Sequence, residues 1–218
     1  IEFDHADIFD DINDIKKQFH HLIKIVPSSG NIIYFKDDKN SSDLIRDGLW
    51  CNKIEINSDS IKTDFKLMEL EVDKKKFSLK ELPLIGKHNF KNYISAILAA
   101  KLDGVLINDS IESLKTFKGV KRRMELVVDA SGIKAYDDFA HHPTAIRLSC
   151  EAIKEKYSDK KILGIIELGS NTMSSGFHKN FIDSFELLDQ TFLLDHKQIY
   201  QYTNCLLYTS DAADDVRS

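Results

Sequence analysis

The segment from Tyr136 to Thr144 concentrates the side chains most able to do chemistry. Within nine residues it carries two carboxylates, two imidazoles and a hydroxyl, namely Asp137, Asp138, His141, His142 and Thr144. A predicted strand leads into it and a predicted helix begins at Pro143. Strand ends in open α/β sheets are where ligands bind. Adjacent histidines point in different directions and no third ligand is spaced for zinc, so the pattern favours another kind of ligand site.

Two asparagines, Asn89 and Asn92, stand three residues apart at the start of a second predicted helix. Amide side chains on one helix face, together with the free N–H groups of a helix start, can bind a nucleotide. Plain N-capping is the alternative interpretation of the same residues. The nearby Gly86-Lys87 pair is not a phosphate-binding loop, because the sequence nowhere contains G-x-x-x-x-G-K-[ST].

Three consecutive cations, Lys121, Arg122 and Arg123, lie where the hydrophobic pattern restarts. An arginine between two domains can bind phosphate, because its planar guanidinium matches the phosphate oxygens. A solvated linker is the alternative.

A mixed cluster of acids and an imidazole, Glu2–Asp7, precedes the first predicted helix. Carboxylates with an imidazole at a strand-to-helix turn can hold a divalent metal, which makes His5 a candidate ligand. The alternative is that Asp4 and Asp7 cap the helix.

The spacing of apolar residues predicts the helices and strands that must position these clusters. The first half is predicted to contain a helix from Ile8 to Val26, a strand at Asn31–Phe35, a helix at Ser41–Gly48, hairpins or edge strands between Lys53 and Leu84, and a helix at Asn89–Asp103, followed by a short helix after Asp109. The second half is predicted to contain a hairpin of Glu125–Val128 with Ile133–Tyr136, a helix from Pro143 to about Tyr157, a strand at Lys161–Leu168, a helix around Phe181–Leu188 and a strand at Phe192–Leu194. Strands that alternate with helices predict a parallel, doubly wound sheet in that half.

Composition bounds the functional class. The chain has 218 residues and a formal net charge of -5, which does not suit electrostatic binding to nucleic acid or to anionic membranes. It lacks a run of about 18 apolar residues and a signal-peptide pattern. Three widely spaced cysteines argue for a reducing compartment, so we expect a cytoplasmic protein. The oligomeric state is left open. We expect the chain to be a fragment, with a non-native tail at residues 205–218.

Taken in order, the four clusters resemble the Mur ligase family, ATP-dependent enzymes that join amino acids or peptides to UDP-N-acetylmuramic acid. The resemblance implies an α/β fold: the later part of a Mur-type central ATPase domain at residues 1–116, then a truncated Rossmann-like C-terminal domain at residues 117–204. The segments Glu2–Phe9, Phe19–Leu22, Asp137–Ile146 and Gly169–Met173 resemble the member that ligates the tripeptide L-alanyl-γ-D-glutamyl-meso-diaminopimelate.

The resemblance also implies roles for single residues. His5 matches a magnesium ligand, and Asn89 and Asn92 match the pair that contacts the adenine end of ATP. Arg123 matches the arginine at the hinge between domains, and Asp138 an aspartate that meets the nucleotide. The incoming amine or peptide is expected at His141, His142 and Thr144, and Arg123, Asp138, His141 and His142 form the implied catalytic set. The implied peptide pocket is Ser170, Asn171 and Thr172, preceded by Gly169 where the family often has arginine.

The implied reaction uses ATP and Mg²⁺ to convert the muramoyl carboxylate into an acyl phosphate, which the amine of the murein tripeptide attacks. UDP-N-acetylmuramate and that tripeptide are the expected small-molecule partners, and peptidoglycan recycling is the expected process. Without a phosphate-binding loop, the chain alone is expected to be inactive. The alternatives are an L-alanine-adding ligase, a folate polyglutamate-type ligase and a non-catalytic nucleotide- or peptide-binding module.

Overall fold

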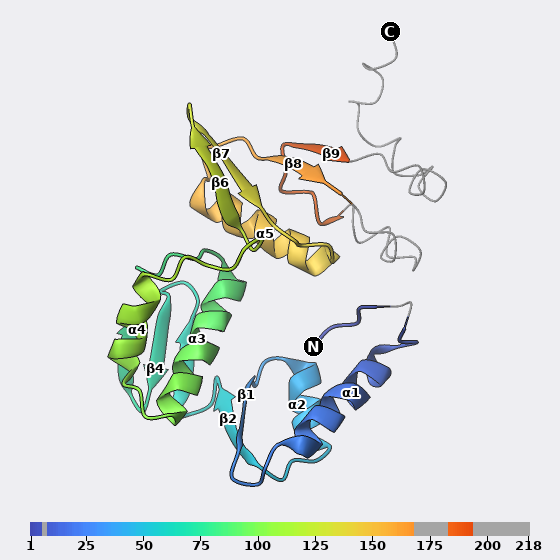
Figure 1. The fold of residues 1–218 in the computed structure, drawn as a ribbon, viewed down its shortest axis with the longest axis vertical. Coiled ribbons are helices and arrows are strands. Elements are labelled where there is room, and N and C mark those ends of the chain that lie inside the picture. Colours follow the sequence, from blue (N-terminus) through green and yellow to red (C-terminus); the bar gives the residue numbers. More distant parts are fainter. Residues whose placement is uncertain (6–7, 168–182, 194–218) are drawn as a thin grey trace. The chain divides into compact units, whose positions relative to one another are not determined.

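The computed structural model describes residues 1–5, 8–167 and 183–193, an α/β chain that separates into two compact units. The first unit joins Ile1–Asp4 to Phe9–Gly119, and the second joins His5–Ile8 to the residues from Val120 onward (Figure 1). The sequence-based boundary, between residues 116 and 117, lies three residues before this division. Among the described residues, every helix is too short or too polar to cross a bilayer.

The first unit starts with a helix and two parallel strands. α1 (Ile12–Ile25) leads to β1 (Asn31–Phe35), α2 (Lys39–Arg46) and β2 (Asn52–Ile56), and β1 pairs with β2 in parallel register. Parallel neighbours need a crossover connection, which α2 supplies. Of the hairpins or edge strands expected from Lys53 onward, β2 therefore belongs to no hairpin and is an edge strand of the described two-stranded sheet, because α2 returns the chain to the same end of β1.

The start of α1 corrects one interpretation from the sequence. Asp11, not Asp4 or Asp7, is the N-cap: its carboxylate accepts hydrogen bonds from the backbone N–H groups of Asn13 (2.7 Å) and Asp14 (3.2 Å). These bonds lower the pKa of the Asp11 carboxyl. The helix begins later than its apolar periodicity suggested, because an N-cap aspartate satisfies two N–H groups that would otherwise lack partners.

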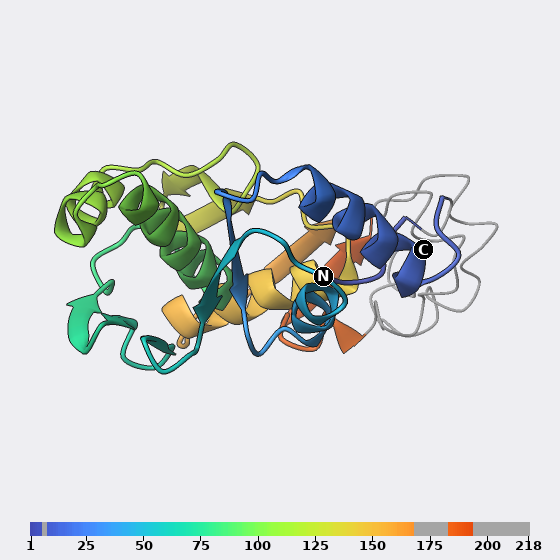
Figure 2. The same ribbon diagram turned by 90° about the horizontal axis from the view of Figure 1, so that it is seen from below.

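The rest of the first unit is a small antiparallel sheet and two helices. β3 (Ile61–Asp64), β4 (Glu69–Val72) and β5 (Lys75–Ser78) form a meander in the order β3-β4-β5. α3 (Lys87–Leu102) and α4 (Ile107–Lys115) follow and run next to each other, as the two green helices of Figure 2 show.

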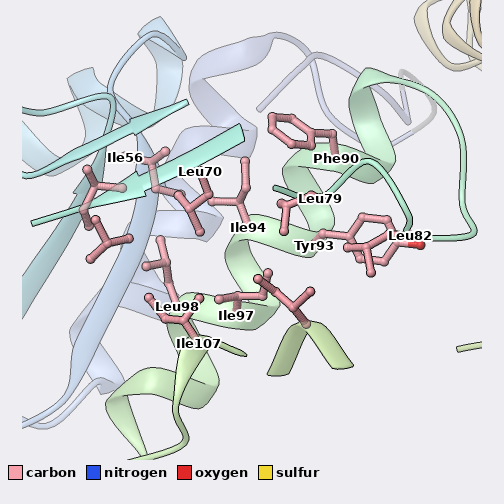
Figure 3. Packing of buried hydrophobic residues seen from close by; sticks show 13 residues of the cluster. Ile56, Leu70, Leu79, Leu82, Phe90, Tyr93, Ile94, Ile97, Leu98 and Ile107 are labelled. Atoms are coloured by element: carbon pink, nitrogen blue, oxygen red, sulfur yellow. The ribbon is translucent and has the colours of Figure 1, made fainter. Parts of the chain in front are cut away.

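One face of α3 forms the centre of the first unit's core. Phe90, Ile94 and Ile97 are fully buried. They pack with side chains from the strands, including Ile56 and Leu70 (Figure 3). The helix predicted at Asn89–Asp103 is confirmed, although Leu102 of its apolar side is exposed. The buried face fixes α3, and with it the two asparagines at the start of the helix.

The second unit combines a hairpin, a helix and a parallel strand pair. β6 (Glu125–Ala130) and β7 (Ile133–Asp137) are antiparallel, α5 spans Pro143–Lys156, and β8 (Leu163–Ile166) pairs in parallel with β9 (Gln190–Leu193). Ser131 and Gly132 close the hairpin with φ values of 54° and 79°, the left-handed pair that a tight two-residue turn requires. The predicted hairpin, the helix from Pro143 and the parallel pairing of the later strands are all present.

A smaller core lies under α5. Ile146 and Cys150 are buried and contact Ala140, Ile166, Phe185 and Leu188. The predicted helix around Phe181–Leu188 falls partly outside the described residues, and Leu188 N donates to Phe185 O (2.8 Å) in a turn. This core attaches α5 to β8, so the loop before α5 is held at the helix start.

Replacing Ile97 with alanine should lower the free energy of unfolding of the first unit by about 2–5 kcal/mol, because it leaves a cavity in a packed core. Leu102→Ala, on the same helix but 43% exposed, should change it by less than about 1 kcal/mol. Urea unfolding followed by the fluorescence of Trp50, the only tryptophan, measures this unit. If Ile97→Ala and Leu102→Ala lowered the free energy of unfolding equally, the described packing of α3 would be contradicted.

Cys150 should titrate abnormally, because burial raises the pKa of its thiol to about 11 and the negative charge of Asp138 adds to the effect. In a Cys51→Ala, Cys205→Ala background, thiolate absorbance against pH should place this pKa well above the ordinary value. Asp138→Asn should lower it part of the way, since one negative charge is removed and burial remains. Glu151→Gln is the matched control, and it should lower the pKa of Cys150 by less than Asp138→Asn does. A Cys150 thiol that titrates near 9, or responds more to Glu151→Gln, would refute this arrangement.

Candidate functional site

The loop between β7 and α5, residues 138–142, carries the candidate site of the second unit. β7 ends at Asp137 and α5 begins at Pro143, so the acids and histidines lie between a strand end and a helix start, as the sequence predicted. Asp138, His141 and His142 are each half-buried. The local hydrogen bonds of the loop decide which of their atoms are available for chemistry.

Asp138 is held at both carboxylate oxygens. Its Oδ1 accepts from the backbone N–H of Ala140 (3.2 Å), and its Oδ2 accepts from Ser149 Oγ (2.5 Å). A hydrogen bond to a charged oxygen is stronger than a neutral one, so the carboxylate has a fixed direction. The sequence analysis missed Ser149. Asp138 lies before α5 and Ser149 within it, 11 residues later, so helical spacing alone does not pair them.

A hydrogen bond fixes the orientation of the His141 ring and the nitrogen that carries its proton. Its Nδ1 lies 3.0 Å from the carbonyl oxygen of Phe139. A carbonyl only accepts, so Nδ1 carries the proton and the lone pair of the neutral ring is on Nε2. Its ring also meets the Phe139 ring edge to face, with centroids 5.1 Å apart. His141 is thus set up to accept a proton at Nε2.

His142 caps α5. Its Nδ1 accepts a hydrogen bond from the backbone N–H of Thr144 (3.3 Å), and Pro143 occupies the first helical position. This interaction satisfies one N–H group of the helix start. The structure therefore gives His142 a structural role besides the substrate contact expected of it, and fixes the backbone that carries Thr144.

The arginines of the cationic run lie beside this loop. The guanidinium carbons of Arg122 and Arg123 are 5.0 Å and 5.5 Å from the centroid of the Phe139 ring. The backbone N–H of Phe139 donates to Arg122 O (2.8 Å), and Arg122 Nε is 3.6 Å from an oxygen of Asp137. Two clusters that the sequence analysis treated separately are therefore neighbours within one unit.

The asparagine pair at the start of α3 divides into a buried and an exposed member. Asn89 is buried, and its Nδ2 donates to Ile85 O (2.8 Å). Asn92 is exposed and its Nδ2 lies 3.4 Å from Asn89 Oδ1. The N-cap is Gly86, which has φ 90° and contributes no side-chain hydrogen bond, so plain N-capping does not account for the pair. Asn89 supports the loop, and Asn92 faces outward.

His5 belongs to a short turn that groups with the second unit. Ile8 N donates to His5 O (2.8 Å), and His5 has a left-handed φ of 55°. Across residues 1–5, 8–167 and 183–193, no three His, Cys, Asp or Glu side chains lie close enough to hold a metal ion. The described residues thus do not form a complete protein site for Mg²⁺. Ser170, Asn171 and Thr172, and the tail at 205–218, lie outside the described residues.

Two family models match the chain. The Mur ligase middle domain matches residues 1–100, and the model described as Mur ligase, glutamate ligase domain matches residues 122–206. The candidate asparagines fall in the first match, and the loop between β7 and α5 in the second.

Single relatives agree with these models. The chain is 38% identical over 207 residues to the UDP-N-acetylmuramate--L-alanyl-gamma-D-glutamyl-meso-2,6-diaminoheptandioate ligase of Escherichia coli, which covers 91% of this chain and 45% of that protein. It is 30% identical over 205 residues to the UDP-N-acetylmuramate--L-alanine ligase of Clostridium botulinum, covering 89% and 44%.

A solved structure shows the same fold. The crystal structure of a murein peptide ligase from Psychrobacter arcticus matches with a TM-score of 0.60 and 32% identity, over 85% of this chain and 41% of that one. The chain spans about half the length of the curated relatives it matches. The resemblance drawn from the four sequence clusters is confirmed, and the α/β chain described here belongs to the Mur ligase family.

Proposed function

We propose that this chain is part of an ATP-dependent ligase that joins L-alanyl-γ-D-glutamyl-meso-diaminopimelate to UDP-N-acetylmuramate. The higher identity to a relative named for this tripeptide, 38% against 30% for a relative named for L-alanine, supports the acceptor. Joining a murein tripeptide to a nucleotide-activated sugar is a step of peptidoglycan recycling. Because both substrates and ATP are cytoplasmic metabolites, we place the enzyme in the cytoplasm.

The observation that carries the proposal is that Asp138 and His141 lie on one loop, and that Arg123 contacts the same loop through the ring of Phe139. A carboxylate fixed at both oxygens, a guanidinium and a histidine with its lone pair on Nε2 suit a reaction that builds charge on phosphoryl oxygens. A carboxylic acid, a nucleotide and an amine can all be positioned by these three types of group.

In the proposed reaction, the muramoyl carboxylate oxygen attacks the γ-phosphorus of ATP and ADP leaves. The amine nitrogen of the tripeptide then attacks the acyl carbon, and phosphate leaves with the electron pair of the broken C–O bond. His141 Nε2 accepts the proton that the amine loses. Arg123 binds phosphate oxygens, Asp138 orients the nucleotide, and Asn92, supported by Asn89, contacts the adenine end of ATP.

We include Mg²⁺ in the proposal only as an ion that accompanies ATP and that His5 contacts. In nucleotide enzymes this ion is bound through few protein oxygens together with the phosphates and water. A lone imidazole on His5 is compatible with that arrangement only as one ligand among several. We therefore assign His5 as a proposed contact and route no step of the reaction through the metal.

A chimera can test the ligase assignment. Residues 1–204 would replace the matching segment of the E. coli relative, which supplies the rest of the enzyme. We expect the chimera to ligate the tripeptide in an ATP-dependent reaction, and Asp138→Asn to lower kcat/KM for ATP by roughly 10- to 100-fold, because the removed charge no longer pairs with polar groups of the nucleotide.

Asp159→Asn provides the matched control, since Asp159 is an exposed aspartate of the same unit whose partner is Lys160 (2.8 Å). It should leave kcat/KM unchanged. A chimera that melts cooperatively and binds ATP but ligates no peptide would favour the non-catalytic binding module.

Acceptor choice separates the two ligase candidates. In the same chimera, kcat/KM should be higher for the tripeptide than for free L-alanine. The double variant Asn171→Ala, Thr172→Ala should reduce kcat/KM for the tripeptide by roughly 10- to 100-fold, because distal polar groups of the peptide lose their partners. Asn108→Ala, an exposed asparagine on α4, should have no effect. A preference for L-alanine would replace the tripeptide assignment with the L-alanine-adding one.

A further inference from the structure

Phe139 is an exposed aromatic residue surrounded by polar partners. Its side chain is 46% exposed, and it lies in the loop between β7 and α5. Its ring contacts the guanidinium groups of Arg122 and Arg123 and the ring of His141. Burial of apolar surface therefore does not explain this residue, and its contacts with cations do.

The two arginines on this ring have different surroundings. Arg122 has a second partner, because its Nε lies 3.6 Å from Asp137 Oδ2. Within the part of the chain that the structure describes, the ring of Phe139 is the sole side-chain partner of Arg123. The charge of Arg122 is thus partly balanced by a carboxylate, whereas Arg123 forms no ion pair with any carboxylate of the described residues.

An aromatic ring and an anion bind different parts of a guanidinium group. The ring attracts the cation through the negative potential of its face, and it forms no conventional hydrogen bond with the N–H groups. The five N–H donors of the guanidinium stay free to form paired hydrogen bonds with phosphate or carboxylate oxygens. A carboxylate partner would occupy those donors. Phe139 can therefore restrict the motion of Arg123 without competing with an anionic ligand.

The backbone that carries the ring is held by hydrogen bonds, and the ring itself packs edge to face on His141. Phe139 N donates to Arg122 O (2.8 Å), which ties the loop to the arginine segment. The next polar groups on either side are also held, Asp138 by Ser149 Oγ and His141 by Phe139 O. A ring in a fixed position can set the direction of a long, flexible side chain, which lowers the ordering cost when a ligand binds.

We propose that Phe139 is a positioning residue for Arg123, holding its guanidinium by a cation–π contact so that its N–H groups bind the phosphates of the nucleotide. This inference rests on the proposed ligase function and extends it to a residue to which that function assigns no substrate contact. The aromatic face, and not the apolar volume of the side chain, is the property that matters.

Substitutions that separate aromatic character from volume test the inference in the chimera described above. Phe139→Leu should raise KM for ATP by about 2- to 5-fold, the size of an exposed cation–π contact, with KM for the tripeptide unchanged. Phe139→Tyr should restore the wild-type KM for ATP. Phe192→Leu, which replaces a phenylalanine of matched exposure (49%) in the same unit, should leave all constants unchanged.

A spectroscopic measurement on the 218-residue chain needs no activity. The Arg123 Nε–H resonance, assigned with Arg123→Lys, should show an upfield ring-current shift that is lost in Phe139→Leu and kept in Phe139→Tyr. An unshifted resonance in the wild-type chain would overturn the inference. So would an unchanged KM for ATP in Phe139→Leu, or an equal rise in the KM for every substrate, which would indicate a general structural effect.

The two proposals fail in distinguishable ways. If the wild-type chimera ligates nothing, the ligase function is refuted, and the ring-current shift then decides only whether Phe139 holds Arg123. If the chimera is active and the shift is present but Phe139→Tyr does not restore the KM for ATP, the ligase function stands and the positioning role is wrong.

Discussion

The direct connection between the end of β7 and the start of α5 is the constraint on which the candidate site depends. Only residues 138–142 separate a strand from a helix, so their polar groups must find partners locally while their side chains remain half-exposed. Three of them do so: Asp138 bonds to Ala140 and to Ser149 of α5, His141 to the carbonyl of Phe139, and His142 to Thr144. A loop tied in this way presents its functional groups with little freedom to reorganise, which favours binding and catalysis.

Two candidate residues combine an observed structural role with a proposed chemical one. His142 caps α5, and Asn89 supports the loop before α3 through Ile85. Such residues complicate mutagenesis, because their loss changes the backbone as well as any ligand contact. Asn92 and Arg123 are better probes of binding, since both are exposed and neither anchors a helix end by its side chain.

Each unit keeps its reactive groups on a scaffold with its own core. In the first unit the buried face of α3 fixes the helix start that carries the asparagines. In the second unit Ile146 and Cys150 fix α5, and with it Ser149. Polar groups at the ends of such elements are held more closely than groups in long loops, because the packed core restricts the helix or strand to which they belong.

The sequence by itself determined the element types and the family. Hydrophobic periodicity predicted the helix that forms α3, alternation in Glu125–Val128 and Ile133–Tyr136 predicted the β6–β7 hairpin, and Pro143 predicted the start of α5, because each of these signals is local. It also placed the acids and histidines between a strand and a helix.

The tertiary structure alone decided which distant groups meet. The parallel pairing of β1 with β2, the hydrogen bond from Ser149 to Asp138, and the contact of Arg123 with Phe139 each join residues that are far apart in the chain. Sequence spacing reports neighbours along one helix or strand, whereas these contacts arise only when separate elements pack together.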